Sequence, residues 1–527
     1  MHIISLRNVR QSLLLIVGWL LLSCSNISYK SYSKAGETSI TPALMKHYIS
    51  YLASDSMKGR NTPGPELDSA ASFISAEFKR FGLKPLNGSF KQNFNICVTD
   101  LGDNNVFYIE HNGVQTNFKI KDDFVPFEIS SGSSCEGQLV FAGYGITAAE
   151  YNYDDYKCLD ARGKIVIVFR HEPGQNDTLS VFKGADDTKY SNLKFKMANA
   201  IKHGAIGMLV ITEPLNYNSI RPRGFPWPSL SKIIPREALP LNLCDEKEES
   251  IPVIHAGEAF VNAVFTSVDS LKQIQKNLDK VLENKYSDLS SFYVFLKTNI
   301  LRIQKPTQNV AGLLPGSDSV LRNETLVIGG HYDHVGVKKD HKVGEDYIFN
   351  GADDNASGTS VVLAVAAAFS KMPLKPERSI LFIAFAGEEK GLFGSKAYTN
   401  NPLLPLKNTV AMLNLDMVGR NSTDSLCLIG NRQSPDIASI VRTENKAEPF
   451  TLFYEKENLL GGSDHYNFYQ CGIPFIFFFS GFHSDYHKVS DNPDKINFDK
   501  TAKVARLVLR VAWHIANQDK HYKIIRK

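Results

Sequence analysis

Histidine and acidic side chains follow several short apolar segments of this sequence, each at the place where a β-strand would end. Four such segments and the residues behind them are 325–329 with His331, 378–386 with Glu388 and Glu389, 409–415 with Asp416, and 473–479 with Tyr486 and His487. Ligands of open α/β sheets bind outside the carboxyl ends of the strands, so these side chains are expected to meet at one sheet edge. The loop with Asp353 and Asp354 adds a carboxylate, and the set has the ligand types of a metal site.

The set is large enough for two divalent cations. Two such ions about 3.5–4 Å apart repel strongly, and a carboxylate that binds both relieves the repulsion. If Asp354 bridges, Glu389 and Asp416 bind one ion each and His331 and His487 do the same, which gives each ion three protein ligands. The three carboxylates and a bridging hydroxide then balance the charge of two Zn²⁺, as a buried site requires. Imidazole and carboxylate ligands favour zinc, with cobalt or manganese as substitutes.

Two further acids are placed to act beside such a site. Asp333 lies two residues after His331, so in extended backbone it faces the same side and can orient the ligating imidazole. Glu388 neighbours a ligand without being needed as one, and it can take a proton from metal-bound water and return it to a leaving amine. Adjacent acids are usually a solvated pair, but the apolar segment leading into this pair favours catalysis.

The elements that must position these residues are predicted from periodicity. Strands and helices alternate between about residues 300 and 520, which favours an α/β fold with a mostly parallel central sheet flanked by helices. Residues 358–369 predict a strongly apolar helix directly behind the Asp354 loop. Apolar spacing predicts further helices over residues 42–53, 66–81 and 501–515.

The middle of the chain, from about residue 95 to 260, has short strands and turns and no cluster of metal-ligand residues. Strands are predicted over residues 138–142, 164–169 and 206–211, and helices over residues 192–203 and 267–282. This change of texture predicts a second, β-rich domain.

The N-terminus has the features of a secretory signal over residues 1–23, since two arginines precede an apolar run too short for a spanning helix. The run ends in Leu21-Leu22-Ser23-Cys24, which resembles the lipobox of bacterial lipoproteins. The resemblance implies cleavage before Cys24, lipidation of its sulfur, and an exported chain anchored to a membrane of the cell envelope, on a periplasmic or surface face. A plain signal peptide with an incidental cysteine is the alternative. Residues 24–40 then predict a polar tether.

Charge and cysteine usage exclude other classes. A formal net charge of +4 over 527 residues is close to balanced, which argues against a nucleic-acid binder. The cysteines after Cys24 are scattered with no CxxC pair, which argues against a zinc–thiolate site. Export permits disulfides, and Cys135 with Cys158 is the pair to test first, with buried free thiols as an equal alternative.

Five motifs in one order resemble the co-catalytic di-zinc peptidases of the bacterial leucyl aminopeptidase, glutamate carboxypeptidase and transferrin-receptor group. They are His331-x-Asp333, residues 351–358 (GADDNASG), Glu388-Glu389-x-Gly391-Leu392-x-Gly394-Ser395, Asn414-Leu415-Asp416-Met417 and Asp485-Tyr486-His487. Residues 51–55, Gly59-Arg60 and 81–83 also resemble the N-terminal helix-loop-helix of exported members. One motif would be weak, but five in order are specific.

The resemblance implies a role for each matched position. Two Zn²⁺ per chain would be bound by His331, Asp354, Glu389, Asp416 and His487. The bridging acid would be Asp354 rather than Asp353, with a non-proline cis bond to Asn355. Glu388 would be the general base. Tyr486 corresponds to a tyrosine that donates a hydrogen bond to the tetrahedral oxyanion in some members, and packing beside the site is the alternative.

The middle region resembles the protease-associated domain in residues 143–146, 153–156, 162–166 and 201–207. The implied organisation is a signal peptide (1–23), a tether (24–40), the N-terminal part of the catalytic domain (41–95), a protease-associated-like insert with a connecting helix (96–290) and the zinc peptidase domain (291–527). The insert is expected to shape or cover access to the site.

The predicted function is an exported zinc-dependent exopeptidase, an aminopeptidase that hydrolyses N-terminal residues from peptides by a di-zinc-bound hydroxide with Glu388 as general base. A carboxypeptidase or a glutaminyl cyclase on the same scaffold is the alternative. A cluster of arginines would favour the carboxypeptidase, and the complete ligand set argues against the mono-zinc cyclase. A non-enzymatic binding protein would be expected to have lost ligands. The side-chain preference and the oligomeric state do not follow from the sequence.

Four other residues have weaker signals. His334 is expected to support the His331 loop, and His483 ranks below His487 as a ligand. His465 is expected to make a structural hydrogen bond, with pocket lining as the alternative. Arg420 has two interpretations that the sequence does not separate: contact with a substrate carboxylate, or a pair with a core acid.

Overall fold

The computed structural model describes residues 34–526 except 183, 185, 232–238, 245–248, 282–287 and 455–458. The predicted signal peptide and Cys24 therefore lie outside the described residues. The chain divides into two compact units: the first contains the residues up to Ile96 and from Lys305 onward, and the second is Cys97–Gln304.

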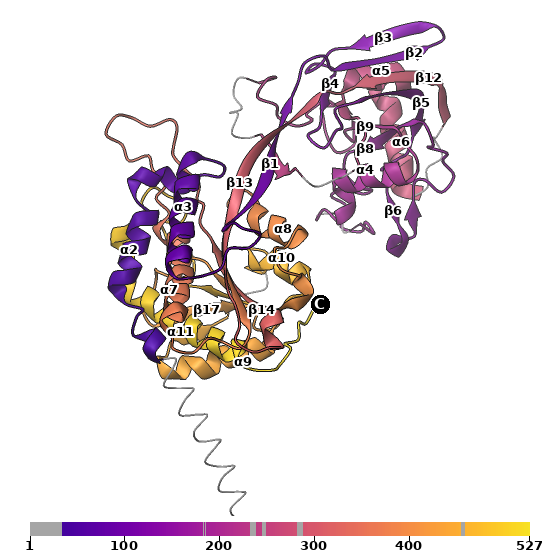
Figure 1. Cartoon of the computed structure of the whole chain (residues 1–527). Coiled ribbons are helices and arrows are strands. Elements are labelled where there is room, and N and C mark those ends of the chain that lie inside the picture. Colours follow the sequence, from indigo (N-terminus) through magenta and orange to yellow (C-terminus); the bar gives the residue numbers. More distant parts are fainter. Residues whose placement is uncertain are drawn as a thin grey trace, which may run out of the picture. The chain divides into compact units, whose positions relative to one another are not determined.

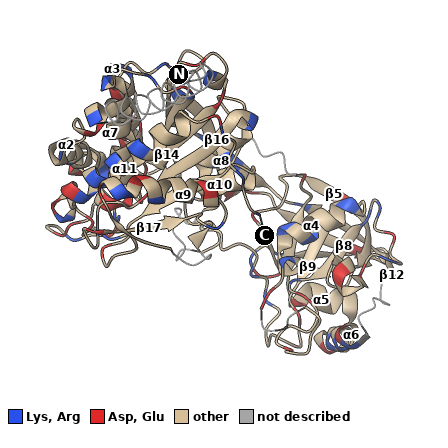
Figure 2. Cartoon of the chain, turned by 90° about the horizontal axis from the view of Figure 1, so that it is seen from below, with Lys and Arg blue, Asp and Glu red and all other residues tan. Residues whose placement is uncertain are grey.

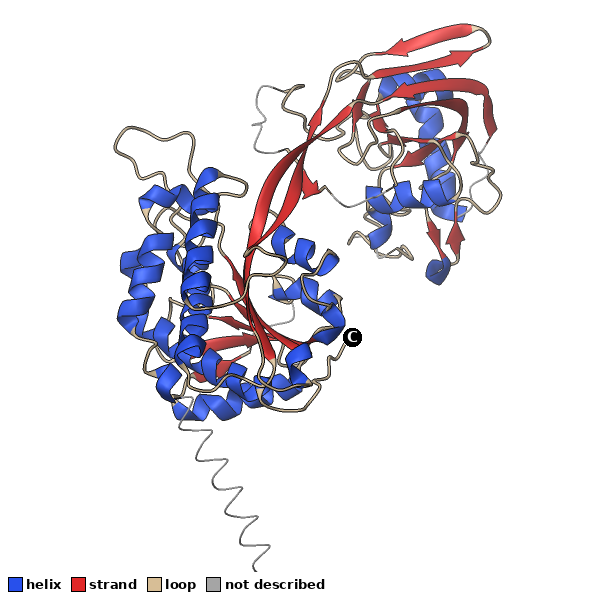
Figure 3. Ribbon diagram, viewed as in Figure 1, coloured by secondary structure: helices blue, strands red, loops and turns tan. Residues whose placement is uncertain are grey.

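The first unit is built on a mixed sheet whose centre is parallel (Figure 3). Strands β15, β14, β16 and β19 are neighbours in that order, and each adjacent pair is parallel. The flanking pairs β13–β15 and β17–β19 are antiparallel. The strands are β1 (Lys91–Leu101), β13 (Ile300–Leu314), β14 (Thr325–His331), β15 (Ser379–Phe385), β16 (Thr409–Leu415), β17 (Ser425–Ile429), β18 (Thr451–Phe453) and β19 (Phe475–Phe479). The four apolar segments of the sequence are thus the four central parallel strands.

Helices cover both faces of this sheet (Figure 1). Helices α2, α3, α7 and α11 contact one another on one side, and α8 contacts α10 on the other. The helices are α2 (Pro42–Leu52), α3 (Pro65–Arg80), α7 (Gly358–Lys371), α8 (Phe393–Asn400), α9 (Pro435–Glu444), α10 (His465–Gln470) and α11 (Phe498–Ala516). The predicted helices over residues 42–53, 66–81, 358–369 and 501–515 are confirmed. Because both faces are covered, every residue of β14, β15, β16 and β19 is buried, which explains their unbroken apolar sequences.

Helix α7 fixes the loop that precedes it. All of its residues from Gly358 to Phe369 are buried, and it contacts β14, β15 and β16 as well as α11. A helix that is apolar all round is stable only inside a core, so α7 has little freedom to shift. The turn that carries Asp354, η6 (Ala352–Ser357), runs directly into it.

The second unit is also an α/β body, with one eight-stranded sheet in the order β3-β2-β12-β5-β8-β9-β11-β4. Its elements are β2 (Val106–His111), β3 (Val114–Phe118), β4 (Phe124–Pro126), β5 (Ser134–Phe141), β6 (Thr147–Ala148), β7 (Tyr153–Asp154), β8 (Ile165–Phe169), β9 (Gly207–Ile211), β10 (Leu241–Leu243), β11 (Val253–Ala256), β12 (Asp288–Lys297), α4 (Leu193–Lys202), α5 (Glu258–Phe265) and α6 (Val268–Val281). The predicted boundary at residue 290 falls inside β12, which completes this sheet between β2 and β5. The resemblance to a protease-associated domain stays a prediction.

The disulfide in the structure differs from the pair chosen for testing. Cys97 and Cys244 are bonded, and Cys135 and Cys158 are free thiols, so the suggested pairing is wrong. Cys158 is exposed, whereas Cys135 lies on β5 with its sulfur close to Gly207 of β9. Burial raises the pKa of the Cys135 thiol to about 12, which makes it unreactive.

Charge is distributed without a dominant sign. Lysine and arginine alternate with aspartate and glutamate over the helices of each unit (Figure 2). None of the helices in the described part of the chain has the length and apolar content of a membrane span.

Replacing both Cys97 and Cys244 by serine should lower the free energy of unfolding. The bond joins residues separated by 147 positions, and closing a long loop restricts the unfolded chain, with typical stabilisation of about 2–4 kcal/mol. Urea denaturation of the oxidised protein measures this. Cys471→Ser, at an exposed free thiol, is the control and should change stability by less than about 0.5 kcal/mol. Equal midpoints for the double variant and the wild type would contradict the prediction.

Candidate metal centre

The carboxyl ends of the four central strands carry the residues predicted to do chemistry. His331 is the last residue of β14, and Asp416 follows the last residue of β16. Glu388 and Glu389 come shortly after β15, and His487 follows β19 after a longer loop. Since these strands are adjacent and parallel, their ends meet at one edge of the sheet, as the sequence predicts.

Two groups of metal-ligand side chains form at this edge. The first group is His331, Asp354 and Asp416, and the second is His334, Asp354, Glu389 and His487. Within each group the nitrogen and oxygen atoms that could bind an ion all lie within 4.8 Å of one another. The structure therefore brings together all five predicted ligands and adds His334.

Asp354 belongs to both groups and faces each with a different oxygen. Its Oδ1 lies 3.3 Å from Nε2 of His331, and its Oδ2 lies 3.1 Å from Nε2 of His487. The remaining contacts are short too: Asp416 Oδ1 is 3.3 Å from His331 Nε2, and Glu389 Oε2 is 3.0 Å from His487 Nε2. This is the geometry expected of a carboxylate that bridges two ions.

The backbone around Asp354 is held by two hydrogen-bond partners, Asp491 and Leu415. The peptide bond between Asp354 and Asn355 is cis, as the family resemblance implies. The main-chain N–H of Asp354 donates to Oδ2 of Asp491 at 3.1 Å. The Asn355 side chain donates to the Leu415 carbonyl at 2.9 Å, which ties the loop to the end of β16.

Asp353, the neighbouring acid, faces a different set of groups. Its Oδ1 accepts a hydrogen bond from the Gly419 N–H at 2.6 Å, and its Oδ2 lies 3.3 Å from Nε2 of His483. Neither Asp353 nor His483 belongs to a candidate metal group. The structure thus separates the two acids, with Asp354 alone in the bridging position.

The imidazole of His331 faces both the main chain and the carboxylate of Asp333, the residue predicted to orient it. Its Nδ1 lies 3.2 Å from the carbonyl oxygen of Asp333 and 3.6 Å from the Asp333 carboxylate. The carboxylate also accepts hydrogen bonds from the Thr62 hydroxyl at 3.0 Å and the Glu388 N–H at 3.2 Å. Asp333 therefore connects the His331 strand end to the Glu388 loop.

His334 takes part in the second group more directly than predicted. Its Nδ1 lies 2.7 Å from Oε1 of Glu389, so the ring orients that carboxylate. The other ring nitrogen, Nε2, is buried without a hydrogen-bond partner. Its position three residues after His331 is a sequence signal that could have suggested this contact.

The donor set fits metal ions. The buried atoms without hydrogen-bond partners include Nε2 of His331 and Oδ1 of Asp416, which face each other across the first group. Buried polar atoms without partners are costly, and coordination of an ion satisfies them. Imidazole and carboxylate donors in two adjoining groups suit zinc.

The pKa directions describe the same surplus of acid. Burial lowers the pKa of His331, but the nearby charges of Asp416 and Glu388 outweigh it and raise the pKa well above its usual range. Burial opposes ionisation of Asp354 as well, yet its contacts with His331 and His487 hold its pKa well below the usual range. Within the protein alone, protonated imidazoles balance the negative charge of these carboxylates. Bound cations provide that positive charge in metal sites of this kind.

Glu388 lies beside the centre but outside both groups. Its carboxylate is 3.8 Å from Nε2 of His331, and its side chain is 13% exposed. Burial raises its pKa well above the usual range; the charge of His331 opposes this shift, and neighbouring acids add to it. It is therefore placed to exchange a proton with a molecule at the centre without being bound to an ion.

An apolar pocket of about 50 Å³ opens next to these residues. Its walls are Asp354, Glu388, Asp416, Met417, Leu459, Gly462, Phe477, Phe479, Phe482 and Tyr486. The Tyr486 ring stacks on His487 with centroids 3.9 Å apart and meets Phe482 edge to face. Burial, followed by the charge of Asp354, raises the pKa of Tyr486, so its hydroxyl remains a donor at neutral pH.

Sequence reasoning missed a hydrogen-bond chain that holds Asp416. The Asn414 side chain donates to Oγ of Ser463 at 2.9 Å, and Ser463 donates to Oδ2 of Asp416 at 2.8 Å. All three residues are buried or nearly so. Asn414 stands in the Asp416 motif, but Ser463 comes from a distant loop and had no signal of its own.

The structure also settles the weaker assignments. Arg420 donates to Asp485 at 2.7 Å and lies 3.7 Å from Asp491, so it pairs with acids beneath the centre. His465 is fully buried and stacks against Phe475 and Phe477. Burial lowers the pKa of His465 to about 3, and it is not among the residues lining the pocket.

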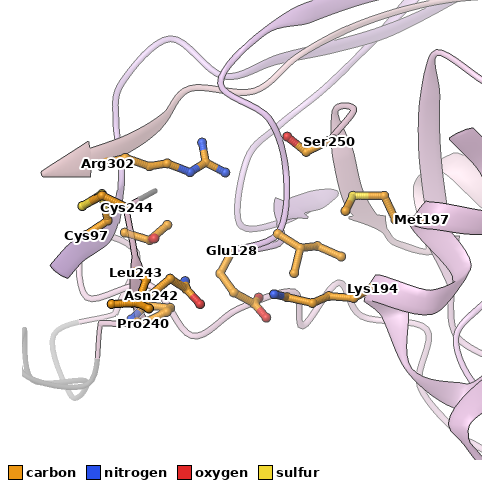
Figure 4. Close-up of a pocket in the computed structure, with 12 residues that line it drawn as sticks. Cys97, Glu128, Lys194, Met197, Pro240, Asn242, Leu243, Cys244, Ser250 and Arg302 are labelled. Carbon is orange, nitrogen blue, oxygen red and sulfur yellow. A yellow bond between two sulfur atoms is a disulfide. The ribbon is translucent and has the colours of Figure 1, made fainter. Parts of the chain in front are cut away.

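The second unit contains a larger cavity, of about 400 Å³, with a different character (Figure 4). The Cys97–Cys244 disulfide lies at one side, and the side chains of Glu128 and Lys194 point toward each other across its floor. Among the residues that the structure describes, none that lines this cavity belongs to a candidate metal group.

The first unit is therefore an α/β protein unit with a candidate two-metal centre at the carboxyl ends of its parallel strands. Residues 309–512 match the profile of peptidase family M28, and every residue of the two metal groups lies within that range. Through this part, the chain is similar to peptidase family M28.

Curated relatives match part of the chain at modest identity. "Aminopeptidase YwaD" of Bacillus subtilis is 28% identical over 42% of this chain and 47% of its own length. A "probable leucine aminopeptidase" of Trichophyton verrucosum is 26% identical over 40% of this chain and 57% of its own. The chain thus matches about half the length of these curated relatives.

Two solved structures align along most of the chain. The aminopeptidase from Aneurinibacillus sp. strain AM-1 is 21% identical, with a TM-score of 0.49, over 94% of this chain and 98% of its own. The zinc aminopeptidase BSAP from Bacillus subtilis is 20% identical, with a TM-score of 0.44, over 93% and 98%.

Ser463→Ala should weaken zinc binding about 10- to 100-fold, because it removes the hydroxyl that holds the Asp416 carboxylate. Competition with a chelator measures the dissociation constant. The matched control is Ser379→Ala, at another buried serine, whose hydroxyl donates to the Arg322 carbonyl at the opposite end of the strands. Equal zinc affinity in both variants would show that the hydroxyl does not support the centre.

Proposed function

We propose that this protein is a zinc-dependent aminopeptidase that removes apolar residues from the N-termini of peptides. The observation that carries the proposal is the pair of donor groups joined by Asp354 beside an apolar pocket that Glu388 lines. The match of residues 309–512 to peptidase family M28, and the aminopeptidases among the relatives, agree with it.

The two groups define which residues hold each ion. One Zn²⁺ would be held by His331, Asp354 and Asp416, and the other by Asp354, Glu389 and His487, with His334 orienting Glu389. When bound, the two ions supply Lewis-acid polarisation of the scissile carbonyl and lower the pKa of a water molecule.

Glu388 carries the proton. It takes a proton from the attacking water and delivers it to the nitrogen of the leaving amine, which must be protonated to depart. Its raised pKa makes the carboxylate a stronger base for the first transfer. Its distance of 3.8 Å from His331 keeps it close to the reacting atoms but outside the ligand set.

Tyr486 stabilises the charge that develops on the carbonyl oxygen. The residue lines the pocket, and it is fixed by its stacking on His487 and its contact with Phe482. A hydrogen bond from its hydroxyl to the developing oxyanion would be strongest in the transition state, which is what raises the rate.

The pocket favours a free amine over a free carboxylate. Its lining combines apolar side chains with three acids, and no lysine or arginine occurs among the lining residues that the structure describes. An N-terminal ammonium group and an apolar first side chain are complementary to such walls. A C-terminal carboxylate lacks a cationic partner, since Arg420 is engaged by Asp485. The carboxypeptidase alternative is therefore less well supported, and two complete donor groups also argue against a one-zinc cyclase.

The zinc-loaded protein should cleave peptides that begin with a free leucine and leave N-blocked copies intact. Glu388→Gln should lower kcat about 10²- to 10⁴-fold while zinc content stays at two per chain, because the variant loses the proton carrier but no ligand. Glu345→Gln, at an exposed acid paired with Lys338, is the control and should keep wild-type activity. Release of C-terminal residues from N-blocked peptides would move the assignment to a carboxypeptidase.

We further propose that the mature chain is exported and attached to a membrane of the cell envelope through lipidated Cys24. The support is the sequence of residues 1–24, where a short apolar run ends in Leu21-Leu22-Ser23-Cys24. A single acyl chain on Cys24 would bind a membrane only weakly. Stable anchoring would need a second acyl chain or another membrane-binding signal.

Cys24→Ala should move the protein from the membrane fraction to the soluble envelope fraction of a bacterial host. The substitution removes the sulfur that carries the lipid but leaves the apolar run. Cell fractionation with immunoblotting measures the distribution, and Cys471→Ala is the control at an exposed cysteine. Wild-type protein found wholly in the soluble fraction would refute the anchor.

A further inference from the structure

A fully buried arginine, Arg60, lies against the metal centre from outside the matched family range. It ends the short helical segment η1 (Asp55–Arg60), which joins α2 to α3, whereas the family match begins at residue 309. The side chain is 0% exposed. A buried guanidinium is rare unless its donors and its charge both find partners, so its surroundings are informative.

The guanidinium of Arg60 spans the two chain segments that carry His331 and Asp354. Its Nε donates to the Tyr332 carbonyl at 2.8 Å, and Tyr332 follows His331 directly. Its two terminal nitrogens donate to the carbonyls of Asn350 at 2.8 Å and Gly351 at 3.0 Å, just before the Asp354 turn. A further bond reaches the Leu52 carbonyl at the end of α2. One planar group thus sets the spacing between two ligand-bearing segments.

The backbone of the same segment adds two ties to these loops. The Arg60 carbonyl accepts the N–H of His334 at 3.2 Å, and the Gly59 carbonyl accepts the N–H of Gly336 at 3.1 Å. Arg60 adopts a positive φ of 47°, which is uncommon for a residue other than glycine and persists only where the surroundings impose it. At Gly59 a Cβ would lie 2.3 Å from the Gly336 carbonyl oxygen, so this approach requires glycine.

The charge of Arg60 faces the acids of the centre. Burial lowers its pKa to about 10, and the acids that oppose this shift are Asp333, Asp354, Asp491 and Glu389. The group is therefore still charged at neutral pH. A lysine would keep the charge but not the planar arrangement of donors that reaches four carbonyls together.

We propose that Arg60 is a positioning residue of the metal centre, which holds the His331 strand end and the Asp354 turn at the separation that two ions require. The kinetic part of this inference rests on the proposed function. The metal-binding part does not, because it concerns only the geometry of the ligands.

A purely structural tie is the rival explanation, and the chain offers a matched control. Arg378 is also fully buried, and it donates to the carbonyls of Ile515 at 2.8 Å and Lys520 at 3.2 Å while pairing with Glu324. These contacts hold the end of α11 and the residues after it, and none of them belongs to a metal group. Loss of either arginine should reduce stability, but only Arg60 should influence the ions.

The experiment compares Arg60→Lys with Arg378→Lys in the full-length mature protein. The zinc dissociation constant is measured by chelator competition, kcat and KM with a leucyl peptide, and the free energy of unfolding with urea. We expect Arg60→Lys to weaken zinc binding about 10- to 100-fold and, at saturating zinc, to lower kcat with KM within about threefold. Arg378→Lys should lower stability and leave zinc affinity and kcat within about twofold.

The proposal is overturned if Arg60→Lys loses stability while zinc affinity and kcat match the wild type. If that variant does not fold, Asn350→Ala decides, since its side chain ties the Asp354 loop to Ala53 and Asp55. Weaker zinc binding supports the proposal and unchanged binding overturns it. A wild type that binds two zinc ions but cleaves no peptide refutes the proposed function alone, because the affinity comparison still tests Arg60.

Discussion

The structure of this centre depends on one carboxylate that faces two sets of ligands. Two divalent ions a few ångströms apart repel each other, and the repulsion is tolerable only if an anion lies between them. Asp354 is in that place, with one oxygen toward His331 and the other toward His487. The contact with Asp491 and the entry into buried helix α7 both fix this side chain.

The fold supplies the remaining ligands because its strands are parallel at the centre. Parallel neighbours end at the same edge, so residues far apart in the chain converge there. Covering helices bury the strands completely and make the edge rigid. Glu388 and the apolar pocket lie at the same edge. Under the proposed function, metal binding, proton transfer and recognition of the first residue would therefore take place on one sheet edge.

The strands and the principal ligands could be predicted because each has a local signal: an apolar segment, followed by a histidine or an acid. Contacts between distant segments have no such signal. Ser463 and Arg60 act through one hydroxyl and several main-chain carbonyls, and carbonyls are present at every residue. The orientation of His331 by the Asp333 carbonyl depends on where the chain turns after β14. The Cys97–Cys244 pairing depends likewise on tertiary proximity, which is why the choice of Cys135 and Cys158 was wrong.

Anomalous diffraction at the zinc absorption edge, from crystals grown with zinc, tests the central claim most directly. The account predicts two peaks on either side of the Asp354 carboxylate, about 3.5–4 Å apart as in other two-metal sites, one beside His331 and Asp416 and the other beside Glu389 and His487. A single peak, or two peaks bridged by Asp353, would contradict it.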